Sequence, residues 1–240
     1  MTDLPDGPIT RSRLADLGIR FASAIILGPV ALALTWLGGH PFAVVCALAG
    51  MAMCWEWNGI TRRNRADLPT LLGIVAIAAA VLVFVGYGLV PALGTMLAGA
   101  AIAQLASPER TMPAGAAAAT IYGALPALAL IIIRSDTDIG LVCVFWLFAI
   151  VWAGDIAAYF TGRTIGGPKL WRRVSPKKTW SGAIGGLIGA VAVSSLVLWQ
   201  SSVETLVPIV LPIVLSIVAQ GGDLAESALK RAYGAKDSSR

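Results

Sequence analysis

Eight apolar runs, separated by short polar segments, dominate the sequence and constrain what it can fold into. They occupy residues 21–37, 41–55, 69–90, 92–106, 114–133, 140–160, 182–200 and 205–219. A helix that spans a bilayer needs about 20 apolar residues, so the runs that begin at 41, 92 and 205 are short. The pattern predicts an all-α, polytopic membrane helix bundle with about eight transmembrane helices, and a count of six or seven remains compatible with it.

The composition supports a membrane protein. The chain is 57% hydrophobic and 13% charged, with a mean hydropathy of +0.79, whereas about a quarter of the residues in a soluble domain are charged. A net charge of +5 would suggest nucleic acid on a soluble domain, but here the cations lie between apolar runs. No nucleic-acid partner is therefore expected. Residues 1–20 read as a flexible cytoplasmic leader, and residues 21–240 as a single membrane domain.

The distribution of positive charge predicts how the helices are oriented. If the N-terminus is cytoplasmic and every run crosses the membrane, 17 of the 18 Lys and Arg residues face the cytoplasm and only Arg134 lies outside. Such a bias follows the positive-inside rule. It places the segments 154–182 and 220–238 on the same, cytoplasmic side, where they are expected to form one site.

The segment 154–182 combines a carboxylate inside an apolar run with the most basic loop of the chain. A carboxylate such as Asp155 is costly in a membrane helix without a partner, so it indicates a functional site. The loop holds six cations among glycine, serine and threonine, a composition that suits phosphate binding. These cations are Arg163, Lys169, Arg172, Arg173, Lys177 and Lys178. The alternative is that they only flank two helices on the cytoplasmic side.

The segment 220–238 carries acidic and basic residues at helical spacing. Asp223, Glu226 and Lys230 lie at positions i, i+3 and i+7, and therefore on one face of a helix. Taken alone, this face could be a solvated surface with weak ion pairs. Beside the basic loop, its carboxylates suit a divalent metal and its cations suit the phosphates that the metal bridges. The only histidine, His40, lies in a turn, which argues against catalysis by histidine. Phosphoryl or nucleotidyl transfer relies mainly on positioning and on charge neutralisation by metal and cations, and is the chemistry that the segments favour.

Two stretches resemble a known family. Residues 154–186, GDIAAYFTGRTIGGPKLWRRVSPKKTWSGAIGG, and residues 221–239, GGDLAESALKRAYGAKDSS, are similar to the phosphatidate cytidylyltransferases, or CDP-diacylglycerol synthases. Weaker similarity lies in WEW at 55–57 and YGALP at 122–126. The resemblance implies transfer of the cytidylyl group of CTP to phosphatidate, with release of pyrophosphate, in the bacterial cytoplasmic (inner) membrane. It implies Mg²⁺ as cofactor and CTP, phosphatidate and the lipid bilayer as partners, and it leaves a second cation and a homodimer open.

The resemblance also implies roles for individual residues. Asp223 would be a metal ligand. Asp223, Lys177 and Lys178 would be the catalytic residues. Asp155 would either bind a cation or pair with one of the lysines. The residues implied to bind substrate are Asp155, Tyr159, Lys169, Ser175, Thr179, Glu226, Lys230, Arg231 and Lys236.

The sequence departs from the family at its end. The family continues past the KDS motif into an acidic motif that supplies further metal ligands, whereas this sequence stops at Arg240. The resemblance therefore implies that the 240 residues as written are inactive or nearly so. Two other functions stay open at this point: a transporter for an anionic solute, which would show broken helices in two corresponding halves, and a CTP-dependent lipid kinase.

Overall fold

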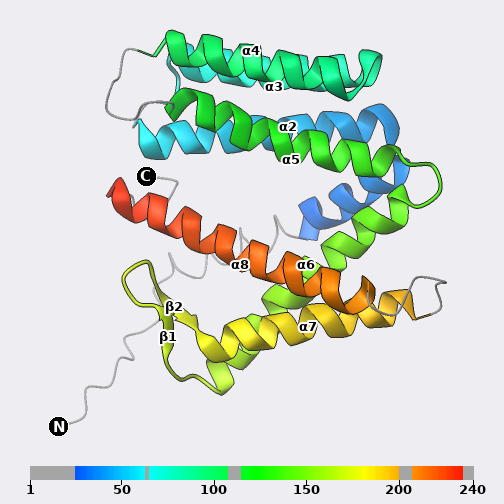
Figure 1. Cartoon of the computed structure of the whole chain (residues 1–240), viewed down its shortest axis with the longest axis vertical. Coiled ribbons are helices and arrows are strands. Elements are labelled where there is room, and N and C mark those ends of the chain that lie inside the picture. Colours follow the sequence, from blue (N-terminus) through cyan, green and yellow to red (C-terminus); the bar gives the residue numbers. More distant parts are fainter. Residues whose placement is uncertain (1–24, 63–64, 108–114, 200–206, 235–240) are drawn as a thin grey trace.

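The computed structural model describes residues 25–62, 65–107, 115–199 and 207–234, which are almost wholly helical (Figure 1). The predicted leader and Lys236 lie outside the described residues. Within these ranges, a helix at Ile25–Leu37 precedes seven helices and one β-hairpin. Their bounds are α2 (Gly39–Thr61), α3 (Leu68–Tyr87), α4 (Leu89–Leu105), α5 (Gly115–Ser135), α6 (Gly140–Thr164), β1 (Lys169–Trp171), β2 (Ser175–Thr179), α7 (Trp180–Leu198) and α8 (Val207–Ala232).

The helix lengths confirm an all-α, polytopic membrane protein. Within the described ranges, six helices are long and apolar enough to cross a bilayer: α2, α3, α5, α6, α7 and α8. The helices Ile25–Leu37 and Leu89–Leu105 are shorter. Two of the three short apolar runs gain length because the helices continue into polar sequence: α2 reaches Thr61 and α8 reaches Ala232.

Local sequence explains where several helices begin and end. Asp67 caps α3 by accepting a hydrogen bond from the backbone N–H of Thr70 at 3.1 Å, and Pro69 lies in the first turn, where its missing N–H is harmless. Gly88 joins α3 directly to α4. Its φ of 87° is a backbone conformation that residues with a Cβ atom rarely adopt. The two helices can therefore fold back on each other through a single residue.

The helices form two groups that pack differently. Helices α2 to α5 enclose a core of buried side chains such as Phe42, Ile77, Met96 and Leu128. Among the described residues, α6 adds the buried Val144 to this cluster and packs the partly buried Phe148 against it. Helices α6 and α7 instead approach closely through small residues. A Cβ built on Gly185 would lie 2.1 Å from the hydroxyl oxygen of Thr161 in α6, so only glycine permits this spacing.

The basic loop of the sequence is a β-hairpin, which the loop interpretation did not foresee. β1 and β2 are antiparallel, with Lys169 opposite Thr179 and Trp171 opposite Ser175. Thr179 then caps α7 by accepting a hydrogen bond from the N–H of Gly182 at 3.1 Å. The backbone N–H of Trp180 also donates to the carbonyl of Pro168 at 3.1 Å. These contacts fix the hairpin against the start of α7.

The polar segments gather at the two ends of the bundle. The hairpin, the end of α2 and the C-terminal end of α8 lie at the left of Figure 1, whereas the α3–α4 turn and the α5–α6 connection lie at the right. Arg134 belongs to the right-hand end, where its guanidinium donates to the carbonyls of Thr35 at 2.6 Å and Trp36 at 2.9 Å. The hairpin and the end of α8 therefore share one end of the molecule.

Candidate active site

A cavity of about 500 Å³ lies where α6, the hairpin, α7 and α8 meet. Cationic side chains line it from α6 and β2, namely Arg163, Lys177 and Lys178. Two carboxylates line it as well, Asp155 from α6 and Asp223 from α8. The two sequence segments that were expected to cooperate thus contribute to one cavity.

The hairpin and α8 are joined by an ion pair inside this cavity. The ammonium of Lys178 donates to Oδ2 of Asp223 at 2.8 Å, although the residues are 45 positions apart in the sequence. The side chains are 33% and 59% exposed, so the pair adds only about 0–1 kcal/mol to stability. The ion pair matters because it places the ammonium of Lys178 and the carboxylate of Asp223 next to each other in the cavity.

Asp155 lies beside this pair without joining it. It shares the cavity with Asp223 and Lys178, but it forms no ion pair with any residue that the structure describes. The two roles implied for Asp155, binding a cation and pairing with a lysine, both stay predictions. Its carboxylate is available to a cation.

The donors in the cavity fit a Mg²⁺ ion that arrives with its substrate. In the described ranges, no three His, Cys, Asp or Glu side chains cluster as a metal cage would require. Mg²⁺ is often held by only one or two carboxylates, with water and substrate phosphates completing the shell. Asp155 and Asp223 line the same cavity and can supply that number.

The remaining hairpin residues differ in their access to the cavity. Lys177 lines it, whereas Lys169 and Ser175 do not. The hydroxyl of Thr179 reaches the cavity wall but is already engaged in capping α7. In α6, the phenol of Tyr159 lines the cavity and accepts a hydrogen bond from Arg163 at 2.9 Å. The implied phosphate-binding roles of these residues stay predictions.

The basic residues of α8 do not lie with those of the hairpin cavity. The ammonium of Lys230 lies between the carboxylates of Glu226, to which it donates a hydrogen bond, and Glu56 of α2, at 3.6 Å. Arg231 is exposed and does not line the hairpin cavity. Helix α8 thus presents Lys230 toward α2, and the anion site that the resemblance implied for Lys230 and Arg231 stays a prediction.

Several residues of the site were not assigned a role from the sequence. Gln220 lines the cavity, and its amide donates to the carbonyl of Ala183 and the hydroxyl of Ser216, both at 3.2 Å. Trp57 and Tyr122 line a second cavity that also reaches Asp223. The WEW and YGALP motifs were the available signals for these aromatic residues. Gln220 begins the segment 220–238, which was expected to form part of the site, but this residue received no role of its own.

Comparison with known proteins identifies the family. Residues 18–240 match the family described as the Cytidylyltransferase family. The phosphatidate cytidylyltransferase of Brucella suis is 42% identical over 232 residues, which cover 95% of this chain and 84% of that protein, and the protein of Brucella abortus gives the same values. The phosphatidate cytidylyltransferase of Bacillus subtilis is 37% identical over 108 residues, or 44% of this chain and 40% of that protein. The chain belongs to the cytidylyltransferase family.

Proposed function

We propose that this protein transfers the cytidylyl group of CTP to phosphatidate and forms CDP-diacylglycerol and pyrophosphate. The observation that carries the proposal is the single cavity in which Lys177, Lys178 and Arg163 face Asp155 and Asp223 at one end of a membrane bundle. The family and the names of the relatives, phosphatidate cytidylyltransferases, support the same reaction. They favour neither the transporter nor the lipid kinase.

In the proposed reaction, a phosphate oxygen of phosphatidate attacks the α-phosphorus of CTP. The new bond joins that oxygen to phosphorus, and the bond from the α-phosphorus to the departing pyrophosphate breaks. No protein nucleophile is needed, so the protein contributes position and charge. Lys177, Lys178 and Arg163 hold the negatively charged phosphates of the two substrates together in the cavity.

Asp223 and Asp155 are the residues that would hold Mg²⁺. The ion supplies charge neutralisation for the phosphate groups as they come together. Lys178 now rests against Asp223 at 2.8 Å, so its ammonium screens that carboxylate before substrate arrives. When a phosphate of the nucleotide enters the cavity, Lys178 would donate to one of its oxygens in place of the Asp223 carboxylate.

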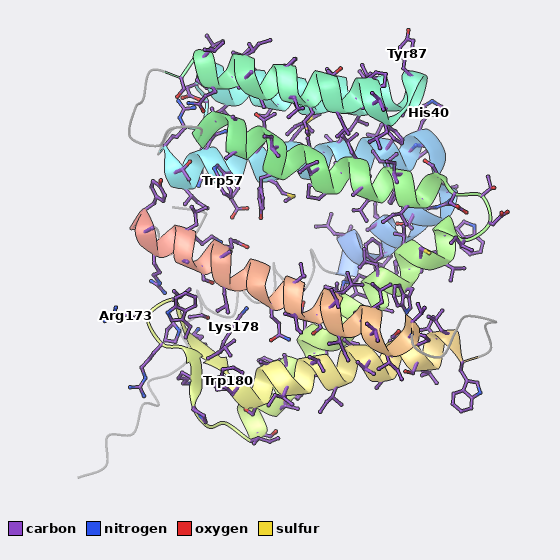
Figure 2. All side chains as sticks on the ribbon, in the orientation of Figure 1. His40, Trp57, Tyr87, Arg173, Lys178 and Trp180 are labelled. Carbon is purple, nitrogen blue, oxygen red and sulfur yellow. The ribbon has the colours of Figure 1, made fainter. Side chains whose placement is uncertain are left out.

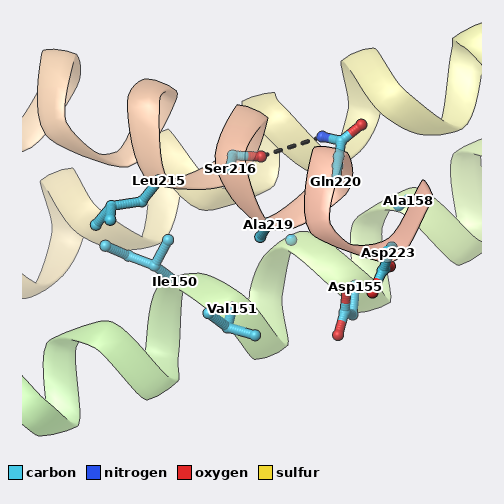
Figure 3. Close-up of a pocket in the computed structure, with 10 residues that line it drawn as sticks. Ile150, Val151, Asp155, Ala158, Leu215, Ser216, Ala219, Gln220 and Asp223 are labelled. Carbon is cyan, nitrogen blue, oxygen red and sulfur yellow. Dashed lines mark hydrogen bonds between the residues drawn. The ribbon is translucent and has the colours of Figure 1, made fainter. Parts of the chain in front are cut away.

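A groove between α6 and α8 suits the lipid substrate. It is lined at one end by Ile150 and Leu215 and at the other by Asp155 and Asp223 (Figure 3). An acyl chain favours the apolar end, and a phosphate head with its cation favours the polar end. A phosphatidate molecule that enters this groove from the bilayer would therefore bring its phosphate to the carboxylates.

We place the hairpin end of the bundle in the cytoplasm and the protein in the bacterial cytoplasmic membrane. The positive-inside bias of the Lys and Arg residues supports this orientation, and the relatives named above come from bacteria. In intact cells, a cysteine introduced at Arg173 of the hairpin should be protected from an impermeant thiol reagent, and one at Asp136 should react. The reverse pattern would overturn the orientation.

The reaction is tested with purified protein, both as residues 1–240 and with a family-type acidic segment added after Arg240, in the presence of phosphatidate, Mg²⁺ and CTP labelled on either the α- or the γ-phosphate. The proposal predicts that the α-label enters a CDP-lipid and that the γ-label leaves as pyrophosphate. Transfer of the γ-label to lipid would identify a kinase instead. Formation of CDP-lipid by Asp223→Asn at the rate of the unchanged protein would show that another site is responsible.

A further inference from the structure

A second cavity lies across α8 from the first. It encloses about 580 Å³ between α2, α5 and α8, and Trp57, Tyr122 and Glu226 belong to its wall. Asp223 lines both cavities. Figure 2 shows Trp57 and Lys178 on opposite sides of α8. A substrate that contacts Asp223 can therefore extend to either side of this helix.

The aromatic wall of the second cavity suits a planar ring. The rings of Trp57 and Tyr122 lie 4.9 Å apart and are tilted by 40°, and Tyr122 is 39% exposed. Aromatic side chains bind nucleobases by stacking. The indole N–H of Trp57 is buried and finds no acceptor among the residues that the structure describes. After a small rotation of the indole, a carbonyl oxygen on a bound ring would satisfy this donor.

The charges of this cavity select for hydrogen-bond donors over phosphates. Glu226 lines it, and the Glu226 carboxylate is held by Lys230, which also lies 3.6 Å from Glu56. Two carboxylates beside one ammonium leave a negative surface, which repels a phosphate and attracts an amine. The cations that suit phosphates line the first cavity. The two cavities thus complement different parts of a nucleotide.

The surface of α8 between the two cavities carries no side chain at Gly222. Gly222 lines the second cavity directly before Asp223, and a Cβ built on Gly222 would meet no atom within 4 Å. The neighbouring Gly221 is equally open, but it lines neither of the two cavities. At Gly222 a ligand can lie against the helix backbone and reach from one cavity toward the other.

We propose that the second cavity binds the base of the nucleotide, an aminopyrimidine, and that Glu226 sets the preference for it. This proposal rests on the function proposed above. The ring stacks on Trp57 and Tyr122, and its exocyclic amine donates to Glu226. The triphosphate passes Gly222 to the cations of the first cavity. A uracil ring presents a carbonyl oxygen where cytosine has the amine, so the Glu226 carboxylate repels it.

The first test compares Gly222→Ala with Gly221→Ala in the full chain. Both changes add one methyl group to α8 and raise its helix propensity equally, but only the first narrows the second cavity. Because one methyl group in a binding pocket changes discrimination about tenfold or more, Gly222→Ala should raise KM for CTP about tenfold. KM for phosphatidate should stay unchanged, and Gly221→Ala should alter neither constant. A rise in KM for phosphatidate alone would assign the cavity to the lipid. Equal KM values for the unchanged protein, Gly222→Ala and Gly221→Ala would show that the base binds outside this cavity. Either result overturns the proposal.

The second test measures base selectivity with Glu226→Gln. Glutamine keeps the size of the side chain but adds an amide that can donate to the uracil carbonyl. The ratio of kcat/KM for CTP to that for UTP should fall about tenfold or more. An unchanged ratio would overturn the proposal.

Equilibrium binding separates this inference from the proposed function. Purified protein without lipid should bind labelled CTP more tightly than labelled UTP, and Gly222→Ala should weaken the binding of CTP. This result is expected whether or not CDP-lipid is formed. Absence of CDP-lipid with intact CTP binding would contradict the proposed reaction alone, whereas CTP binding that Gly222→Ala leaves unchanged would contradict the base site alone.

Discussion

Helices α2 to α5, the first group, and helices α6 to α8 with the hairpin, the second group, divide stability and chemistry between them. In the apolar windows of α2, α3 and α5, 39% to 44% of residues are buried inside the molecule, compared with 17% to 28% in α6, α7 and α8. The first group carries the apolar core. The second carries Asp155, Lys178 and Asp223, which line a cavity.

The charged groups of the second group lie in cavities, because an unpaired charge in a dry core is costly. Many other exposed side chains of these helices are apolar, such as Ile156, Ile188 and Val214, and suit contact with lipid. The first group supplies the rigid partner against which the open group is held, and it contributes the wall formed by Trp57 and Tyr122.

The largest expected effect falls on Asp223, in the open group. Asp223→Asn removes a charge that acts mainly as the reaction proceeds, so kcat should fall about a thousandfold, with a smaller change in CTP binding. Asp136→Asn is the matched control in the α5–α6 connection. There the backbone N–H of Ile139 and, to a smaller extent, that of Asp138 donate to the carboxylate and lower the pKa of Asp136. Near-normal turnover of Asp223→Asn across a magnesium titration would make Asp223 structural.

The packed group should show the opposite behaviour. Leu128 of α5 is 2% exposed within the core cluster, and Leu128→Ala should lower the free energy of unfolding by about 2–5 kcal/mol because it leaves a cavity. KM for CTP should not change at a temperature where the protein stays folded. Thermal unfolding in detergent and steady-state kinetics measure the two quantities. A changed KM without a loss of stability would end the division between the groups.

Lys178 tests whether the hairpin acts by position or by charge alone. Lys178→Ala should lower kcat/KM about a hundredfold, since it removes a donor directed at the reacting phosphates. Arg173→Ala removes an equal charge from the outer edge of the same hairpin (Figure 2), and its effect should be much smaller. Equal losses in both variants would show that the hairpin cations only set topology.

A smaller effect is expected at the close contact between α6 and α7. Gly185→Ala places a methyl group against Thr161, and this overpacking should cost about 1–3 kcal/mol. Because α6 and α7 also frame the cavity, activity should fall together with the thermal midpoint. Gly221→Ala, with open space around it, is the control. A loss of stability with full activity would mean that the site tolerates movement of these helices.

The sequence predicted the membrane helices, whereas the roles of the site residues stay predictions. Apolar runs and charge placement were enough for the spans, because bilayer thickness determines helix length. The hairpin was missed because Pro, Lys and Ser in the SPKKT motif are typical of a loop, and the pairing of Lys169 with Thr179 depends on nonlocal contacts. Likewise, the spacing of Glu226 and Lys230 allowed their ion pair to be considered from the sequence, whereas the approach of Lys230 to Glu56 depends on the fold.

The most direct test concerns the claim that the hairpin and α8 form one site. In a protein whose Cys46, Cys54 and Cys143 are replaced by Ala, Lys178→Cys and Asp223→Cys are combined and treated with a short bismaleimide. The 2.8 Å contact between the two native side chains predicts an intramolecular link that keeps the two parts together after proteolysis between them. Lys178→Cys combined with Asp136→Cys, whose second cysteine lies at the other end of the bundle, should form none. Failure of the first pair to link, or equal linking of both pairs, would contradict the shared site.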